Sequence, residues 1–92
     1  MKDNRPIPDQ VPDYLRDVWS EVRDQCKPST PTAAIEAMAR QLYLLRDAER
    51  RITEEGSVIV DGKGNATEHP AIKIQRDAGK EVREWLKRWG SR

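Results

Sequence analysis

Five basic side chains near the C-terminal end of the sequence repeat at steps of three and four residues. They are Lys73, Arg76, Lys80, Arg83 and Lys87. On a helix this spacing places them on one face, over about 20 Å, while Asp77, Glu81 and Glu84 fall on another. A row of cations can neutralise successive phosphates and give a salt-sensitive affinity for DNA. The other interpretation is a solvated face paired with carboxylates of a neighbouring helix, and the sequence leaves both open.

The residues that could support catalysis or bind a metal or a nucleotide stand apart from one another. Cys26 falls on the apolar side of a predicted helix with no histidine nearby, so we expect a buried, unreactive thiol. His69 is the sole histidine and is expected to serve at a helix entry beside Pro70. The glycines at 62 and 64 lack the spacing of a phosphate-binding loop. We therefore expect no enzymatic activity, no cofactor and no metal.

The composition is that of a small protein with little apolar material. The chain has 92 residues, of which 36% are hydrophobic and 36% charged, with no phenylalanine and a net charge of +1. A domain of this size buries only about 60–65% of the surface of its unfolded chain, so we expect identical copies to share apolar surface in an oligomer. One cysteine excludes an internal disulfide, and we see no signal peptide or long apolar run. These features favour a reduced, soluble, cytoplasmic protein.

The element that must organise the fold is a predicted long helix over residues 32–55. Its apolar residues recur at three- and four-residue steps, with Glu49 as the one polar member of the row: Ile35, Met38, Leu42, Leu45 and Ile52. Thr30 is expected to cap the start of this helix, and Gly56 suits the closing position, where a positive φ is wanted. Everything else has to pack against this helix.

Two further helices are predicted, over residues 12–26 and 70–89. The connector at 56–69 has a β-branched run and a glycine-containing turn, so it is either a small β-hairpin or an extended connector. Residues 1–11 are expected to form a flexible arm. The fold class that follows is mainly α, with a short N-terminal helix and a long antiparallel helical hairpin, in one helical domain over residues 12–90.

The large apolar side chains of these helices are the candidates for the core or for contacts between copies. They are Trp19, Leu42, Leu45, Val82, Trp85 and Trp89. On the last helix the apolar stripe is expected to run through Ala71, Ile74, Ala78, Val82, Trp85 and Trp89. This stripe would lie antiparallel on the central helix.

The order of these parts resembles a known family. A tryptophan-bearing helix is followed by a long helix ending in Arg51–Gly56, a β-branched run, a glycine turn, and a Glu-His-Pro-Ala start at residue 68 of a helix that closes near Gly90. Over residues 13–90 this resembles the small terminase subunits of tailed bacteriophages, in particular the P27-like family. The resemblance implies a non-enzymatic protein of a phage or prophage in the host bacterial cytoplasm. It also implies an oligomeric ring that binds double-stranded viral DNA and regulates the ATPase and nuclease of the large terminase subunit during packaging.

Two functional hypotheses follow. In the first, the chain is this DNA-recognition subunit, and the basic row binds duplex DNA by its backbone and shape. In the second, the chain is a small helical scaffold or regulator, and its charged stripes serve only contacts between proteins. Charge reversal in the basic row separates the two, because it removes DNA binding in the first case and oligomerisation in the second.

Overall fold

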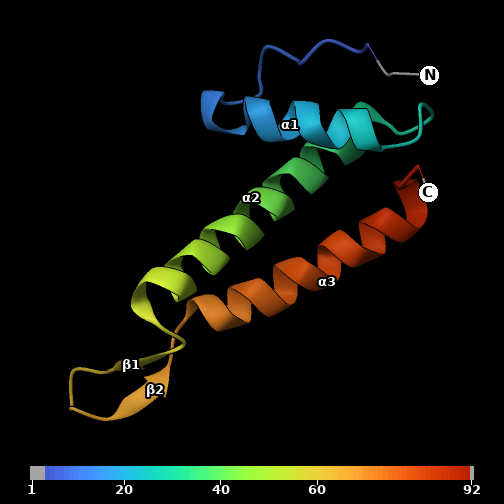
Figure 1. The fold of residues 1–92 in the computed structure, drawn as a ribbon. Coiled ribbons are helices and arrows are strands. Elements are labelled where there is room, and N and C mark those ends of the chain that lie inside the picture. Colours follow the sequence, from blue (N-terminus) through green and yellow to red (C-terminus); the bar gives the residue numbers. More distant parts are fainter. Residues whose placement is uncertain (1–3, 92) are drawn as a thin grey trace.

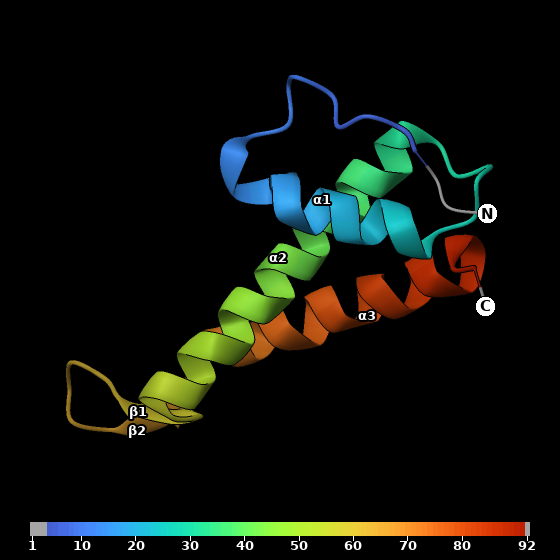
Figure 2. The ribbon, with the colours of Figure 1, turned by 45° about the horizontal axis from the view of Figure 1, so that its top comes forward.

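The computed structural model describes residues 4–91, which form three helices and one two-stranded hairpin. In chain order these are α1 Asp13–Gln25, α2 Thr32–Glu55, β1 Val58–Val60, β2 Ala66–Glu68 and α3 Ala71–Trp89. Figures 1 and 2 show α3 folded back antiparallel to α2, while α1 lies across the N-terminal half of α2. The predicted fold class, mainly α with a helical hairpin and a small β-hairpin, is confirmed, and each helix begins and ends within one residue of its expected range.

The molecule is elongated. Its principal extents are 54 × 27 × 17 Å and its radius of gyration is 16.0 Å, whereas a compact chain of this length would have a radius of gyration of about 12 Å. Its accessible surface is 6407 Å², against about 5,500 Å² for a compact monomer of the same mass. The single chain therefore leaves more surface in water than a self-sufficient globule would.

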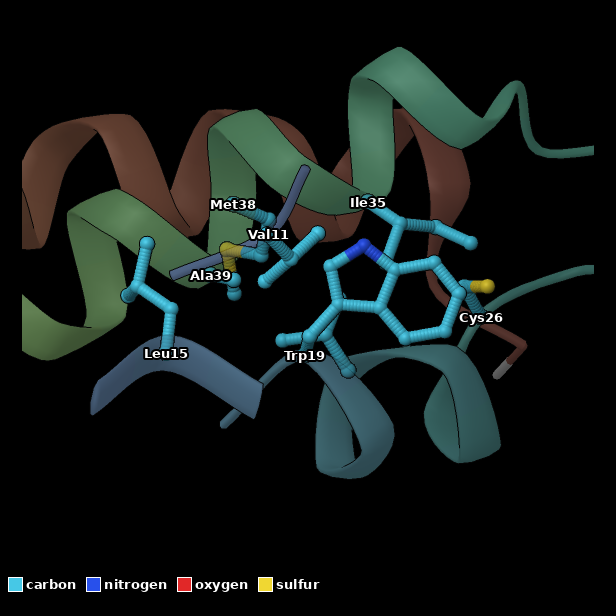
Figure 3. Packing of buried hydrophobic residues seen from close by; sticks show 8 residues of the cluster. Val11, Leu15, Trp19, Cys26, Ile35, Met38 and Ala39 are labelled. Carbon is cyan, nitrogen blue, oxygen red and sulfur yellow. The ribbon is translucent and has the colours of Figure 1, made fainter. Parts of the chain in front are cut away.

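The hydrophobic core lies where α1 crosses α2, and Trp19 is at its centre (Figure 3). Trp19 and Leu15 of α1 are fully buried, against Ile35 and Ala39 of α2 and against Val11 from the segment before α1. The other predicted core candidates lie around this cluster or beyond it. Leu42, Val82 and Trp85 are partly buried against the cluster, and Leu45 and Trp89 are partly buried elsewhere on α2 and α3.

Beyond this core, α2 and α3 approach each other through small residues. Ala48, Ala71 and Ala78 are buried, so the helices meet there through short side chains. The expectation that Ile74 belongs to the inner stripe of α3 is wrong, because its side chain is 36% exposed. At about 100° per residue the inner face passes through Gln75, which is partly buried, and leaves Ile74 at its edge.

The C-terminal end of α3 is attached to the rest of the protein by hydrogen bonds. The indole Nε1 of Trp85 donates to the carbonyl oxygen of Ala34 at 2.8 Å. The backbone N–H of Lys27 donates to the carbonyl of Trp89 at 2.9 Å, and that of Ser91 to the carbonyl of Gln25 at 3.2 Å. The end of α3 is thus bonded to α2 through one side chain and to the end of α1 through the main chain.

Of the two residues predicted to end α2, Gly56 behaves as expected and Thr30 does not. Gly56 has the positive φ expected of the closing residue, at +86°, and its N–H donates to the carbonyl of Ile52. The expectation that Thr30 caps the helix is wrong. Pro31 occupies the capping position, and within the described residues the buried hydroxyl of Thr30 has no hydrogen-bond partner.

The predicted flexible arm is described only from residue 4, and there it is extended along the protein. The guanidinium of Arg5 donates to the carbonyls of Thr30 (2.6 Å) and Pro28 (3.1 Å), and Arg23 donates to the carbonyl of Arg5 at 2.8 Å. Val11 is buried in the core. The first three residues lie outside the described part of the chain.

The start of α3 is organised by His69, as the sequence predicted. The imidazole is buried, its Nδ1 accepts the backbone N–H of Ala71 at 2.9 Å, and its Nε2 lies 3.2 Å from Oε1 of Glu55. Because Nδ1 is the acceptor, the proton belongs on Nε2, which donates to Glu55. One side chain thereby caps α3 and links it to the end of α2.

Replacing His69 is expected to destabilise the protein through this cap. His69→Ala leaves the N–H of Ala71 without its acceptor and removes the bond to Glu55, at an expected cost of about 1–2 kcal/mol in urea unfolding. His69→Asn is the matched control, since its amide oxygen can accept the same N–H, and it should recover part of the loss. Equal destabilisation by the two variants would contradict the capping role.

A second prediction concerns the ion pair between α1 and α2. Arg46 donates to Glu21 at 2.8 and 2.5 Å, and this hydrogen bond lowers the pKa of the Glu21 carboxyl. A carboxyl whose pKa is lowered by folding adds stability above its unfolded pKa of about 4.3, and this stability is lost as the pH falls through the folded pKa. Because both side chains are more than a third exposed, the contribution is expected to be below about 1 kcal/mol.

Glu21→Gln tests this ion pair. The variant should melt at a lower temperature than the wild type at pH 7, and the gap should close as the pH is lowered below about 4. Thermal unfolding followed by circular dichroism at several pH values measures both. A gap that is constant with pH would show that the substitution acts through packing and not through the charge.

Candidate nucleic-acid interface

The inner face of α3 decides where its basic side chains point. Ala71 and Ala78 are buried against the rest of the protein, and Val82 and Trp85 pack against the core. The five predicted cations lie on the opposite side of the helix, and all of them are exposed: Lys73, Arg76, Lys80, Arg83 and Lys87. The structure thus places the predicted row along one solvent-facing side of a 19-residue helix. We call this row the basic face.

The basic face is almost free of ion pairs. Within residues 4–91 none of the ion pairs involves Lys73, Lys80, Arg83 or Lys87. Arg76 lies 4.0 Å from Glu68, and both side chains are at least 60% exposed, so this contact contributes little. The alternative in which carboxylates of a neighbouring helix neutralise the row is therefore not realised inside the described protomer.

The arginines of α2 behave in the opposite way, because each of them has a carboxylate partner. Arg40 pairs with Glu36, Arg46 with Glu21, Arg50 with Asp47 and Glu54, and Arg51 with Glu55. The partners of Arg50 also raise the pKa of its guanidinium, mainly through the hydrogen bond to Asp47. Among the described residues the cations of α2 are thus neutralised by carboxylates, whereas those of the basic face on α3 are almost all unpaired.

The charge of the chain is unevenly divided among its helices. α1 has two basic and four acidic residues, α2 has four and five, and α3 has six and three. The sixth cation of α3 is Arg88, whose guanidinium stacks over the ring of Trp89 at 4.9 Å. Although the net charge of the chain is only +1, α3 has an excess of positive charge. The electrostatic field near α3 is therefore set by the charges of this helix and not by the net charge of the chain.

The geometry of the basic face suits a nucleic-acid backbone. From Lys73 to Lys87 the row covers about 21 Å of helix axis, a length comparable to about six base pairs of duplex DNA. Long lysine and arginine side chains on one face can adjust to phosphates at slightly different heights. Lysine and arginine are the side chains that neutralise phosphates, so the row is suited to contacts with the backbone.

One exposed patch was missed in the sequence. Tyr14 of α1 and Tyr43 of α2 meet edge to face with ring centroids 4.9 Å apart, and with Leu44 and Arg40 they line a hollow of about 420 Å³. Tyr43 and Leu44 lie between Leu42 and Leu45 in the sequence and so fall outside the three- and four-residue spacing of the apolar row of α2. Large apolar side chains outside that row were the sequence signal for an exposed patch. The patch lies on α1 and α2, away from the basic face.

The described residues offer neither a metal site nor a membrane-spanning helix. Within residues 4–91 no group of three or more histidine, cysteine or acidic side chains is arranged to hold a metal ion. No helix in this part of the chain is long and apolar enough to cross a membrane. Cys26 is buried, as expected, and its thiol donates to the carbonyl of Arg23 at 3.3 Å.

Fold and charge together define a small helical protein with one cationic helix face and an unusually large exposed surface. The family model described as "Phage terminase, small subunit" matches residues 16–90, which covers α1 from its second turn to the end of α3. The chain therefore belongs to the phage terminase small subunit family. The comparisons with curated proteins and with solved structures gave no significant match. Membership of the P27-like branch stays a prediction.

Proposed function

We propose that this phage terminase small subunit is the oligomeric DNA-recognition component of a genome-packaging motor. Copies assemble into a ring, the ring binds double-stranded viral DNA through α3, and the complex regulates the ATPase and nuclease of the large terminase subunit in the host bacterial cytoplasm. The small subunit itself has no enzymatic activity. The proposal combines the family to which the chain belongs with the properties of the basic face.

The observation that carries the DNA-binding part is the absence of neutralisation on α3. On α2 every arginine has a carboxylate partner, whereas Lys73, Lys80, Arg83 and Lys87 have none within the described chain. Unpaired cations in a row repel one another, and an external polyanion relieves this repulsion while releasing its own counterions. Duplex DNA is a polyanion of this kind.

The support for assembly comes from the surface. The accessible area exceeds that of a compact monomer, and it includes several large apolar side chains. Those that are at least 36% exposed are Tyr14, Tyr43, Leu44, Val58, Val60, Ile74 and Leu86. They lie on α1, α2, the hairpin and α3, so more than one contact surface is available, as a closed ring requires.

The experiment that tests DNA binding is a salt titration with a fluorescent duplex. The affinity should fall steeply with salt, with a slope of log K against log salt of about −4 to −5 for five phosphate contacts per protomer. Two unrelated sequences should bind with similar affinity if the contacts are to the backbone. No binding at low salt would contradict the proposal.

Assembly is tested separately, by light-scattering mass at several protein concentrations. The proposal expects a mass many times that of the 10.6 kDa chain. A monomer at all concentrations would remove the ring. A large assembly that binds no DNA would favour the scaffold hypothesis instead, in which the charged stripes contact only proteins.

A further inference from the structure

The outer edge of β1 has unused main-chain hydrogen-bonding groups. In the hairpin Val58 pairs with Glu68, Ile59 with Thr67 and Val60 with Ala66. Backbone bonds join residues 61 and 65 below this ladder and residues 57 and 69 above it. Since hydrogen-bonded and non-hydrogen-bonded pairs alternate in an antiparallel ladder, Ile59 bonds to β2, and the N–H and C=O groups of Val58 and Val60 point away from β2. Within the described chain nothing pairs with them.

The side chains of the same two residues are also uncovered. Val58 is 62% exposed and Val60 is 70% exposed, and both lie on one face of the hairpin because strand residues alternate in direction. Figures 1 and 2 show the hairpin at the far end of the molecule, with its turn projecting beyond the ends of α2 and α3. Proteins usually protect such an edge by keeping the strand short or with a lysine, a proline or a bulge; β1 is short, with three residues, but its Val-Ile-Val sequence has none of the other devices.

We propose that β1 pairs with β1 of a second copy of this chain, in an antiparallel arrangement with a two-fold axis at Ile59. A protein segment that replaces water at this edge must be an extended strand, because a strand matches the spacing of the two outward N–H and two outward C=O groups of Val58 and Val60. The segment is a palindrome, Val-Ile-Val, so the same three residues in reverse direction match it. Val58 of each copy then lies opposite Val60 of the other.

The resulting sheet would bring its valine side chains together and keep its carboxylates apart. It has four strands in the order β2, β1, β1 and β2, and four valine side chains cluster on one face. Two strands alone are marginally stable in water, whereas a larger sheet with an apolar face is stable. The acidic residue of the hairpin ladder, Glu68, is on β2, so the two copies of this carboxylate lie on the outer strands, away from the junction.

This contact is independent of the DNA-binding part of the proposed function and adds to the assembly part. It is isologous, so it joins copies in pairs, whereas closing a ring requires a heterologous contact elsewhere on the surface. Loss of the β1 contact should therefore halve an assembly of paired rings or split a dimer, and it should leave the basic face of each protomer unchanged.

Disulfide trapping tests the register directly. Ile59→Cys is made in a Cys26→Ala background, in which circular dichroism first checks that the chain is folded. In the proposed register the two Ile59 positions form a non-hydrogen-bonded pair with Cα atoms about 4.5 Å apart, which is within the range that a disulfide spans. Mild oxidation should convert most of the chain to a cross-linked dimer on non-reducing electrophoresis.

The matched control is Thr67→Cys in the same background. Thr67 faces Ile59 across the hairpin and is more exposed, so random collisions would cross-link it at least as well, whereas the proposed register keeps it on an outer strand. The double substitution Val58→Lys and Val60→Lys, combined with Ile59→Cys, should abolish the cross-link, because lysines of the two copies would then lie opposite each other.

Three outcomes overturn the proposal. They are equal cross-linking of the Ile59 and Thr67 variants, no cross-linking of the Ile59 variant at concentrations where the wild type is oligomeric, and a cross-link that survives the two lysines. The second outcome would leave the edge to a strand of a different protein. Salt-dependent DNA binding is measured on the same reduced samples, so a failure of the β1 contact and a failure of DNA recognition are distinguished.

Discussion

Reversing two charges on the basic face, Arg76→Glu with Arg83→Glu, is expected to lower the affinity for duplex DNA by about a hundredfold or more near 0.1 M salt. Each reversal removes one phosphate contact and adds a repelling carboxylate. The slope of log K against log salt should become shallower by about 2, since each lost contact releases about one counterion fewer. A salt titration with a fluorescent duplex measures both effects.

The control for this prediction is Arg40→Glu with Arg50→Glu on α2. It changes the net charge by the same amount, but its arginines are already paired with carboxylates. A general electrostatic effect would weaken DNA binding equally in both variants, and this outcome would contradict a specific role of α3. If the α3 variant instead lost its oligomeric mass, the scaffold hypothesis would be supported.

Replacing Trp19 is expected to have the largest effect on stability. Trp19→Ala empties the centre of the only cluster of large buried side chains in the described part of the chain, at an expected cost of about 3–5 kcal/mol. For a domain of this size, with a stability of roughly 5–15 kcal/mol, the melting temperature should fall by about 15 °C or more. Circular dichroism during thermal unfolding measures the shift.

Trp19→Phe is the matched variant. Within the described residues the indole N–H of Trp19 is buried without a hydrogen-bond partner, and phenylalanine removes this unsatisfied donor while keeping an aromatic ring in the site. Removing the unsatisfied donor stabilises the protein, whereas the smaller ring of phenylalanine packs less well and destabilises it. The net loss in the free energy of unfolding should therefore be below about 1.5 kcal/mol. A loss as large as that of alanine would show that the exact shape of the indole, rather than burial of an aromatic ring, holds α1 on α2.

Most of the fold was predictable because helix periodicity and turn chemistry are local properties. The apolar rows of α2 and α3 predict two helices without knowledge of their packing, and the glycine turn at 62–64 makes a hairpin one of two expected forms of the connector. Ile74 and Thr30 were misplaced for a related reason, since both depend on how one helix is rotated against another or on how the chain enters it. Those properties are decided by packing between distant residues.

The position of the basic face was predictable from the sequence, but whether carboxylates would neutralise it was not. The spacing of Lys73, Arg76 and Lys80 places them on one face in any helix. Whether carboxylates neutralise such a face depends on which helix lies beside it, and the sequence contains sixteen acidic residues that could have done so. The unpaired state of α3, and the uncovered edge of β1 formed by Val58 and Val60, became visible only in the arrangement of the elements.

The junction between the last turn of α3 and the end of α1 has a mechanical consequence. Lys27 and Ser91 make their bonds to Trp89 and Gln25 through peptide groups alone, so the attachment does not depend on which side chains these positions have. If a translocating duplex pulls on α3, the load passes from peptide to peptide into α1 and so to the Trp19 cluster. The side chains of Lys27 and Ser91 can therefore change without loss of the attachment, whereas Gly90 between the two bonds cannot, because a Cβ there would lie 2.5 Å from the carbonyl oxygen of Leu86.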